Sequence, residues 1–302
     1  MRQLPYERVA IRGANCWLSA LDFGGADKPP LVILHGMRDH ALSMLSLVEA
    51  LQGTYRVIAP DLRGHGDSEN CGSYAMVQFV ADLRAVVNHF ALVGPTLIGH
   101  SLGGHITSRY AAIYGDEVRA LVLIDGMGPP RPPRVLSAEE ARQNWRQNVE
   151  AALQLSSERR SIASADAAVE RLAGNNPRLA AARARLIAEQ GVEPHPEGGV
   201  RWKWDPAVNM VWSTFDHSES EAQWQHITAP VLVLTGEHSM EYWSGARFDL
   251  NDDGSLHERE IRRRVALFRD ARHQEIGGAG HMIHYDSPDA LNQCISDFLA
   301  AT

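Results

Sequence analysis

The sequence has few cysteines and no long apolar run. Its 302 residues include only Cys16, Cys71 and Cys294, at no spacing typical of disulfides or a thiolate metal site. Three scattered thiols indicate a reducing compartment, so we expect a cytoplasmic protein. No segment approaches the roughly 20 apolar residues of a membrane span, and the first residues do not resemble a signal peptide. We therefore expect no membrane partner.

The sequence also lacks runs of charge of one sign. It contains 29 Lys and Arg against 37 Asp and Glu, which gives a formal net charge of -8. An acidic balance without a basic cluster argues against binding to the phosphate backbone of nucleic acid. The expected partner is therefore a small-molecule substrate, and the oligomeric state is left open.

Short runs rich in Val, Ile and Leu recur between segments with helical periodicity. The strands that these runs predict are 30–34, 55–60, 95–99, 121–125 and 230–236. The runs are apolar throughout, as expected for strands covered on both faces. Alternation of strands and helices predicts an α/β fold with a mostly parallel central sheet. The opening segment, 6–23, alternates in polarity and predicts an antiparallel hairpin at the sheet edge.

The alternation stops after Asp125, where a proline-rich stretch begins. Helical patterns at 137–155, 165–173 and 179–190 then precede the next strand. Helices inserted between two late strands would cover the carboxyl ends of the sheet, where open α/β sheets bind ligands. We therefore predict a core domain of residues 1–128 and 229–302 and a helical cap of residues 129–228.

The stretch 99–104, Gly-His-Ser-Leu-Gly-Gly, fits the G-x-S-x-G pattern of a nucleophile elbow. It follows an expected strand and precedes an expected helix, which is the context that this motif requires. The turn is sharp, so the positions two residues on either side of the serine must lack side chains. The pattern predicts Ser101 as the nucleophile.

A serine nucleophile needs a base and an oxyanion hole. His281 ends a Gly-Gly-Ala-Gly-His loop late in the chain, in the order expected for this kind of site, and His284 is a weaker alternative. Two backbone amides should stabilise the oxyanion. Leu102, directly after the nucleophile, and Met37, in the loop after the strand at 30–34, are the candidates.

Four ordered motifs together resemble the α/β-hydrolase superfamily. They are His-Gly-Met at 35–37, Asp-Leu-Arg-Gly-His-Gly-Asp-Ser at 61–68, the elbow at 99–104 and Gly-Ala-Gly-His at 278–281. The second motif is similar to a loop of epoxide hydrolases, haloalkane dehalogenases, haloperoxidase-like esterases and C–C bond hydrolases. The first two groups use Asp as nucleophile, so Ser101 argues against both of them. The stretches 125–129, 165–179 and 198–206 are similar to the narrower "serine hydrolase-like" subgroup.

The sequence offers several candidates for the acid of the triad. In much of the superfamily an Asp follows the late strand at a position where this chain has Ser239 or Met240. Three carboxylates remain as candidates: Asp125, Glu237 and Glu241. The resemblance to haloalkane dehalogenases, which often place the acid after the preceding strand, favours Asp125, with the two glutamates as alternatives.

The predicted activity is hydrolysis of a carboxylic ester by Ser101, His281 and Asp125, without a metal or another cofactor. Arg38, Trp204 and Trp212 are candidate pocket residues, although tryptophans of the cap can equally serve packing. The alternatives are a C–C bond or lactone hydrolase with the same triad, and a ligand-binding receptor with weak hydrolysis. Fold resemblance alone does not separate them.

Overall fold

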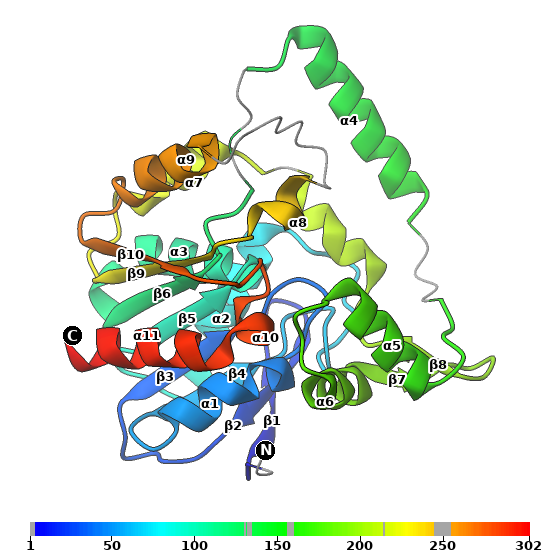
Figure 1. The fold of residues 1–302 in the computed structure, drawn as a ribbon, viewed down its shortest axis with the longest axis horizontal. Helices are drawn as coiled ribbons and strands as arrows, with labels where there is room; N and C mark the ends of the chain where they lie inside the picture. The colour runs from blue at the N-terminus through cyan, green and yellow to red at the C-terminus, as the bar shows by residue number, and fades with distance from the viewer. Residues whose placement is uncertain (1–3, 130, 132–134, 156–159, 214, 245–254) are drawn as a thin grey trace.

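An eight-stranded sheet forms the centre of the computed structural model, which describes residues 4–129, 131, 135–155, 160–213, 215–244 and 255–302. The strand order is β1-β2-β4-β3-β5-β6-β9-β10 (Figure 1). The strands are β1 Glu7–Arg12, β2 Trp17–Asp22, β3 Pro30–Leu34, β4 Arg56–Pro60, β5 Thr96–His100, β6 Ala120–Ile124, β9 Val231–Gly236 and β10 Ala271–Ile276. β2 pairs antiparallel with β1 at one edge and with β4, and the strands β4, β3, β5, β6, β9 and β10 pair in parallel. The predicted parallel sheet and edge hairpin are confirmed.

Helices cover both faces of the sheet (Figure 1). Leu31 and Ile33 of β3 pack in the cluster formed with α1 (Leu45–Leu51) and α11 (Pro288–Ala300). Val32 and Leu34 point to the other face, where α2 (Met76–His89) and α3 (Leu102–Ile113) lie. Because neighbouring residues of a strand point to opposite faces, burial of both faces explains the uninterrupted apolar runs. The other helices outside the segment between β6 and β9 are η1 Ala41–Met44, η2 Gly115–Glu117, α8 Met240–Ser244, α9 Ser255–Val265 and α10 Ile283–Asp286.

A long segment lies between β6 and β9, and we call residues 126–230 the inserted segment. Its elements are α4 Ala138–Leu153, α5 Ala165–Asn175, α6 Ala181–Gly191, β7 Val192–Pro194, β8 Val200–Trp202, η3 Pro206–Trp212 and α7 His217–Trp224. α4 begins with the expected capping box of Ser137 and Glu140 and stands away from the rest of the chain (Figure 1). The β7–β8 hairpin was not predicted, because strands of three residues carry too little periodicity to detect.

The inserted segment is attached to the core through the motif loop 61–68. Three consecutive residues of the segment, 203–205, make these contacts. They are an ion pair of Lys203 with Asp67 at 2.7 Å, a β-bridge of Trp204 with His65, and a hydrogen bond from the Asp205 amide to the Gly64 carbonyl at 2.8 Å. The loop therefore holds one side of the inserted segment in a fixed position.

A buried ion pair holds the same loop against α2. The Arg63 side chain is 1% exposed and donates two hydrogen bonds to Asp82, at 2.7 and 2.8 Å. Arg63 also donates to the Ala14 carbonyl at 2.9 Å, and Asp82 accepts from the Ala14 amide at 2.8 Å. The pair thus links the motif loop, α2 and the β1–β2 turn.

Two of the three cysteines lie next to each other, which their separation in sequence did not predict. A hydrogen bond from the Cys16 thiol lowers the pKa of Cys71 to about 7. All three cysteines are free thiols in the structure.

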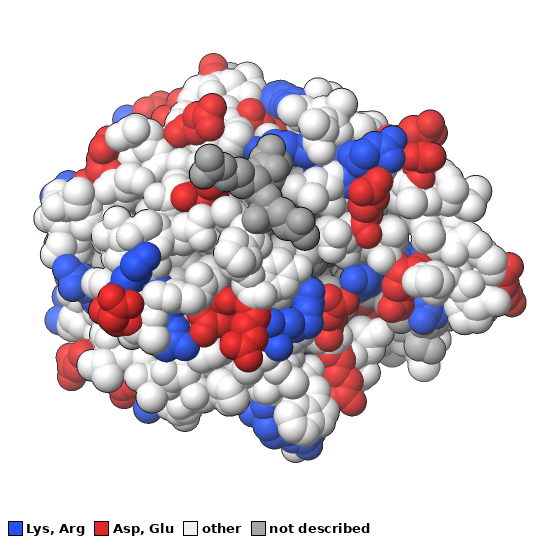
Figure 2. Space-filling view, turned by 90° about the horizontal axis from the view of Figure 1, so that it is seen from below, with Lys and Arg blue, Asp and Glu red and all other residues white. Residues whose placement is uncertain are grey.

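Charges of both signs are mixed on the surface. On the face shown in Figure 2, Lys and Arg side chains lie beside Asp and Glu side chains in several small groups. Among the described residues, no helix is long and apolar enough to cross a membrane.

Candidate active site

Ser101 lies at the sharp turn between β5 and α3. Its backbone angles, φ 50° and ψ -115°, are in a region that non-glycine residues rarely adopt. The turn is tight because helix and strand meet closely: a Cβ added at Gly103 would lie 2.5 Å from the Leu34 carbonyl oxygen, and one added at Gly99 would overlap the Gly103 backbone. The structure therefore has the elbow geometry that the motif predicts.

His281 lies beside the serine, on the loop after β10. Its Nε2 accepts a hydrogen bond from the Ser101 hydroxyl at 3.0 Å. The residue is 5% exposed, and the ring of Tyr242 stacks on the imidazole with centroids 4.1 Å apart and planes 17° apart. Burial and stacking restrict the orientation of the imidazole.

Asp125 completes a row of three hydrogen-bonded side chains. The Nδ1 of His281 donates to the Asp125 carboxylate at 2.6 Å. Asp125 directly follows β6, and β6 is the neighbour of β5, which ends at the elbow. Adjacent parallel strands therefore bring Ser101 and Asp125 to the same edge of the sheet.

The two alternative carboxylates have other partners. Glu237 accepts a hydrogen bond from the Gly278 amide at 2.8 Å. Glu241 forms a bidentate pair with Arg178, at 2.9 Å for both oxygens. Both ring nitrogens of His281 are already hydrogen-bonded in the row described above. The geometry thus favours Asp125 over either glutamate.

A buried arginine supports the loop that follows Asp125. The guanidinium of Arg264 is hydrogen-bonded to the three carbonyls of residues 127–129, at 2.6 to 3.3 Å. Arg264 also pairs with Glu260 at 2.8 Å and is 4% exposed. Asp125 itself has a positive φ of 43°, so its backbone conformation needs such support.

The predicted oxyanion donors belong to two different segments of the chain. Leu102 is the first residue of α3, where the helix supplies no acceptor for the amide and its dipole favours negative charge. The Met37 amide lies in the loop after β3 and donates to no acceptor in the described part of the chain. Both amides thus remain candidates for an oxyanion hole.

His35 links the loop that contains Met37 to the backbone of Leu62. It is fully buried, and its Nε2 accepts from the Leu62 amide at 3.0 Å, so the Nδ1 proton is donated to the Gly36 carbonyl at 2.7 Å. Burial lowers the pKa of His35 to about 3 and that of its neighbour His65 to about 4. Both rings are neutral in the folded protein.

Acid should therefore destabilise the fold before the carboxylates titrate. The unfolded chain protonates His35 and His65 near pH 6.5, whereas the folded chain does not. The free energy of unfolding should fall as pH drops from about 7 to about 5, by up to about 1.4 kcal/mol per pH unit for each ring. Urea unfolding at a series of pH values measures this slope. His65→Gln should reduce it and the exposed control His226→Gln should not; an equal slope in all three proteins would contradict the assignment.

A second buried polar group lies behind the elbow. Asp39 accepts from His284 Nε2 at 3.1 Å and from the Tyr285 hydroxyl at 3.0 Å. His100 donates from Nε2 to the His281 carbonyl at 3.0 Å. Asp39, His100 and His284 each offer one potential ligand atom, and these three atoms lie within 4.8 Å of one another. Among the residues that the structure describes, these three form the group that could hold a metal ion. His284, the alternative base, thus belongs to this group rather than to the row at Ser101.

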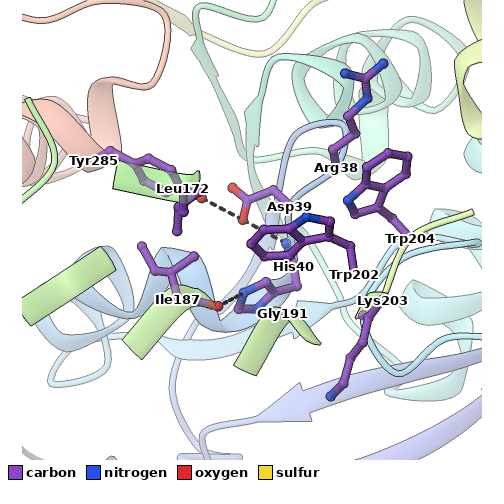
Figure 3. A pocket seen from close by; sticks show the side chains of 11 residues that line it. Arg38, Asp39, His40, Leu172, Ile187, Gly191, Trp202, Lys203, Trp204 and Tyr285 are labelled. Atoms are coloured by element: carbon purple, nitrogen blue, oxygen red, sulfur yellow. Dashed lines mark hydrogen bonds between the residues drawn. The ribbon is translucent and has the colours of Figure 1, made fainter. Parts of the chain in front are cut away.

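A small cavity of about 20 Å³ lies between the inserted segment and the loop after β3. It is lined by Arg38, Asp39, His40, Gly66, Leu172, Ile187, Gly191, Trp202, Lys203, Trp204 and Tyr285 (Figure 3). The structure thus brings two predicted pocket residues, Arg38 and Trp204, to one wall. Trp212 lies elsewhere, against the rings of His105 and Phe215. Trp224 stacks on Phe268 and is 2% exposed, as a packing residue would be.

Sequence reasoning missed Tyr242 and the bond between Asp39 and His284. Tyr242 belongs to α8, which has only five residues and no usable periodicity. Asp39 follows the His-Gly-Met motif closely, and His284 follows His281, so their nearness to site motifs was the available signal.

Comparison with known proteins agrees with this fold. A family model described as "alpha/beta hydrolase fold" matches residues 29–288. A serine hydrolase-like protein of Danio rerio is 27% identical over 92% of this chain and 83% of its own length. A 2-(acetamidomethylene)succinate hydrolase of Mesorhizobium japonicum is 27% identical over 90% of this chain and 88% of its own. Among solved structures, a thioesterase domain from the curacin biosynthetic pathway superimposes with a TM-score of 0.80, at 21% identity, over 97% of this chain and 99% of that domain.

Proposed function

This chain belongs to the α/β-hydrolase fold family and is a hydrolase, and we propose that it cleaves a carboxylic-ester-type bond through an acyl-enzyme on Ser101. The observation that carries the proposal is the row of hydrogen bonds from Ser101 through His281 to Asp125, at 3.0 and 2.6 Å. Three side chains in this order are the arrangement that activates a serine hydroxyl.

In the proposed reaction, His281 Nε2 takes the hydroxyl proton of Ser101 while Oγ attacks the carbonyl carbon of the ester. Asp125 keeps the Nδ1 proton oriented and stabilises the imidazolium that forms. The amides of Met37 and Leu102 stabilise the tetrahedral oxyanion. The intermediate collapses and the alcohol leaves with the proton from His281. A water molecule, deprotonated by His281, then attacks the acyl-enzyme and releases the carboxylic acid.

We propose that residues 129–228 form a cap over this site and that residues 1–128 and 229–302 form the core. The contacts of residues 203–205 with the motif loop support this division, and so does the cavity between the two parts. The substrate would be a small molecule in a cytoplasmic setting, and the reaction as written uses no cofactor.

The nucleophile can be tested by covalent labelling. A fluorophosphonate probe should label the folded protein on Ser101, because the probe captures a serine that a neighbouring base activates. Mass spectrometry of the tryptic peptide locates the adduct. Ser101→Ala should abolish both labelling and ester turnover, whereas Ser108→Ala, a buried serine of α3 away from the triad, should keep both. Labelling at another residue, or none in folded protein, would refute the proposal.

The same triad also suits a C–C bond or lactone hydrolase. A panel of p-nitrophenyl esters of increasing acyl length separates these from an esterase. Turnover of the panel supports ester cleavage, while labelling of Ser101 without ester turnover favours the specialised reactions. Stabilisation by a ligand without labelling or turnover would favour a receptor.

A further inference from the structure

Arg38 is a cation at the site without an anionic partner. Its guanidinium donates to the amide oxygen of Asn209 at 2.8 Å and lies 5.2 Å from the centre of the Trp204 ring, and both of these groups are neutral. No carboxylate among the described residues forms an ion pair with it. Two nearby cations differ in this respect: Lys203 is paired with Asp67, and Arg178 with Glu241.

The position of Arg38 connects the nucleophile with the cavity. A Cβ added at Gly36 would lie 3.2 Å from the Ser101 Cβ, so this loop touches the nucleophile, and Arg38, two residues further, lines the cavity. Partial burial raises the pKa of the Tyr242 hydroxyl, and the charge of Arg38 opposes that rise. Tyr242 stacks on His281, so the charge of Arg38 acts on a side chain that contacts the imidazole.

The backbone at Arg38 has a positive φ, as it does at Ser101 and Asp125. Five non-glycine residues of the described chain have positive φ, and three of them are Ser101 at 50°, Asp125 at 43° and Arg38 at 61°. Strain of this kind persists where the surrounding structure enforces it, often at functional sites. The conformation fixes the point from which the Arg38 side chain extends, and in Figure 3 its guanidinium lies beyond Trp204, on the side away from the other labelled residues.

The wall beside Arg38 offers aromatic surface against which an apolar chain could pack. Trp202 and Trp204 supply aromatic surface, and the Lys203 ammonium points to the opposite side from Arg38 (Figure 3). Asp39 also lines the cavity. Its oxygens, however, already accept from the His40 amide at 2.9 Å, from Tyr285 and from His284. The local anion is therefore satisfied, while the cation retains free donors.

We propose that Arg38 binds a carboxylate on the acyl part of the substrate, so that the preferred substrates are half-esters of dicarboxylic acids. A guanidinium binds a carboxylate in bidentate geometry, and Trp204 keeps the planar group in position. The apolar chain between the ester and the carboxylate packs against the two tryptophans. This proposal rests on the ester hydrolysis proposed above.

Matched ester pairs test it. 4-Nitrophenyl hexanoate and mono-4-nitrophenyl adipate differ by a methyl group against a carboxylate, and the butyrate–succinate and valerate–glutarate pairs vary the length. After subtraction of spontaneous hydrolysis, kcat/KM for the anionic ester should exceed that for its neutral partner by roughly 10- to 100-fold in at least one pair. Arg38→Gln should bring this ratio to about one or below, and Arg38→Lys should retain part of it.

Arg178→Gln is the matched control, because it removes a nearby cation that is already paired with Glu241. Its ratio should equal that of the wild type. If the wild-type protein cleaves neutral esters and its anionic-to-neutral ratio of kcat/KM is near or below one, this inference alone is overturned. The same holds if Arg38→Gln has the ratio of the wild type. Absence of turnover in both series together with absence of Ser101 labelling would refute the proposed function itself.

Discussion

Replacing Asp125 with Asn should lower kcat for an ester substrate by roughly 10³- to 10⁴-fold while the protein stays folded. Asp125 accepts the Nδ1 proton of His281 at 2.6 Å, which leaves Nε2 free to accept from Ser101. An Asn can instead donate its amide to Nδ1 and so favour the other tautomer, in which Nε2 carries the proton. The imidazole could then no longer deprotonate the serine.

The measurement compares kcat of the variant with that of Glu237→Gln and Glu241→Gln, the two alternative acids. Circular dichroism and thermal unfolding check that each protein is folded. Both glutamine variants should keep kcat within a few-fold of the wild type, because Glu237 binds a backbone amide and Glu241 binds Arg178. Near-normal turnover of Asp125→Asn, with loss in either glutamine variant, would show that the acid is misassigned.

Replacing Asp82 with Ala should give the largest loss of stability among the changes considered, about 3–5 kcal/mol. The variant would leave the guanidinium of Arg63, 1% exposed, without its carboxylate partner. An unpaired buried charge costs far more than a lost surface contact. The amide of Ala14 would lose its acceptor as well.

Chemical unfolding measures the loss, with Glu49→Ala as a control in which an exposed carboxylate is removed. The control should change stability by less than about 0.5 kcal/mol. The double variant Arg63→Met/Asp82→Leu should recover part of the loss, since it removes both charges. If Asp82→Ala is too unstable to purify, Asp82→Asn gives a milder form of the same test. A loss below 1 kcal/mol in Asp82→Ala would contradict the structural role of the pair.

The sheet and the elbow could be predicted because local sequence determines them. Strands buried on both faces leave uninterrupted apolar runs, and the run at 230–236 corresponds to β9 almost to the residue. The elbow demands small residues at Gly99 and Gly103 for a steric reason that is visible in the sequence itself. These features needed no knowledge of distant contacts.

The acid could not be chosen with the same certainty, because Asp125 and His281 are separated by 156 positions. Sequence alone gives three carboxylates of similar chemistry. What distinguishes them is the partner of each: the Gly278 amide for Glu237 and Arg178 for Glu241. These partners depend on the path of loops, which local propensity does not determine.

The order of the strands has a consequence for biosynthesis. Ser101 and Asp125 belong to one β–α–β unit, so they are placed by contacts between residues close in sequence, which form early in folding. His281 follows Asp125 by 156 positions and reaches the site only when β10 has paired with β9. A nascent chain that has been synthesised as far as β9 already contains the proposed nucleophile and acid but not the proposed base. Under the proposed mechanism, the site would therefore be complete only after β10 has been synthesised and has paired with β9.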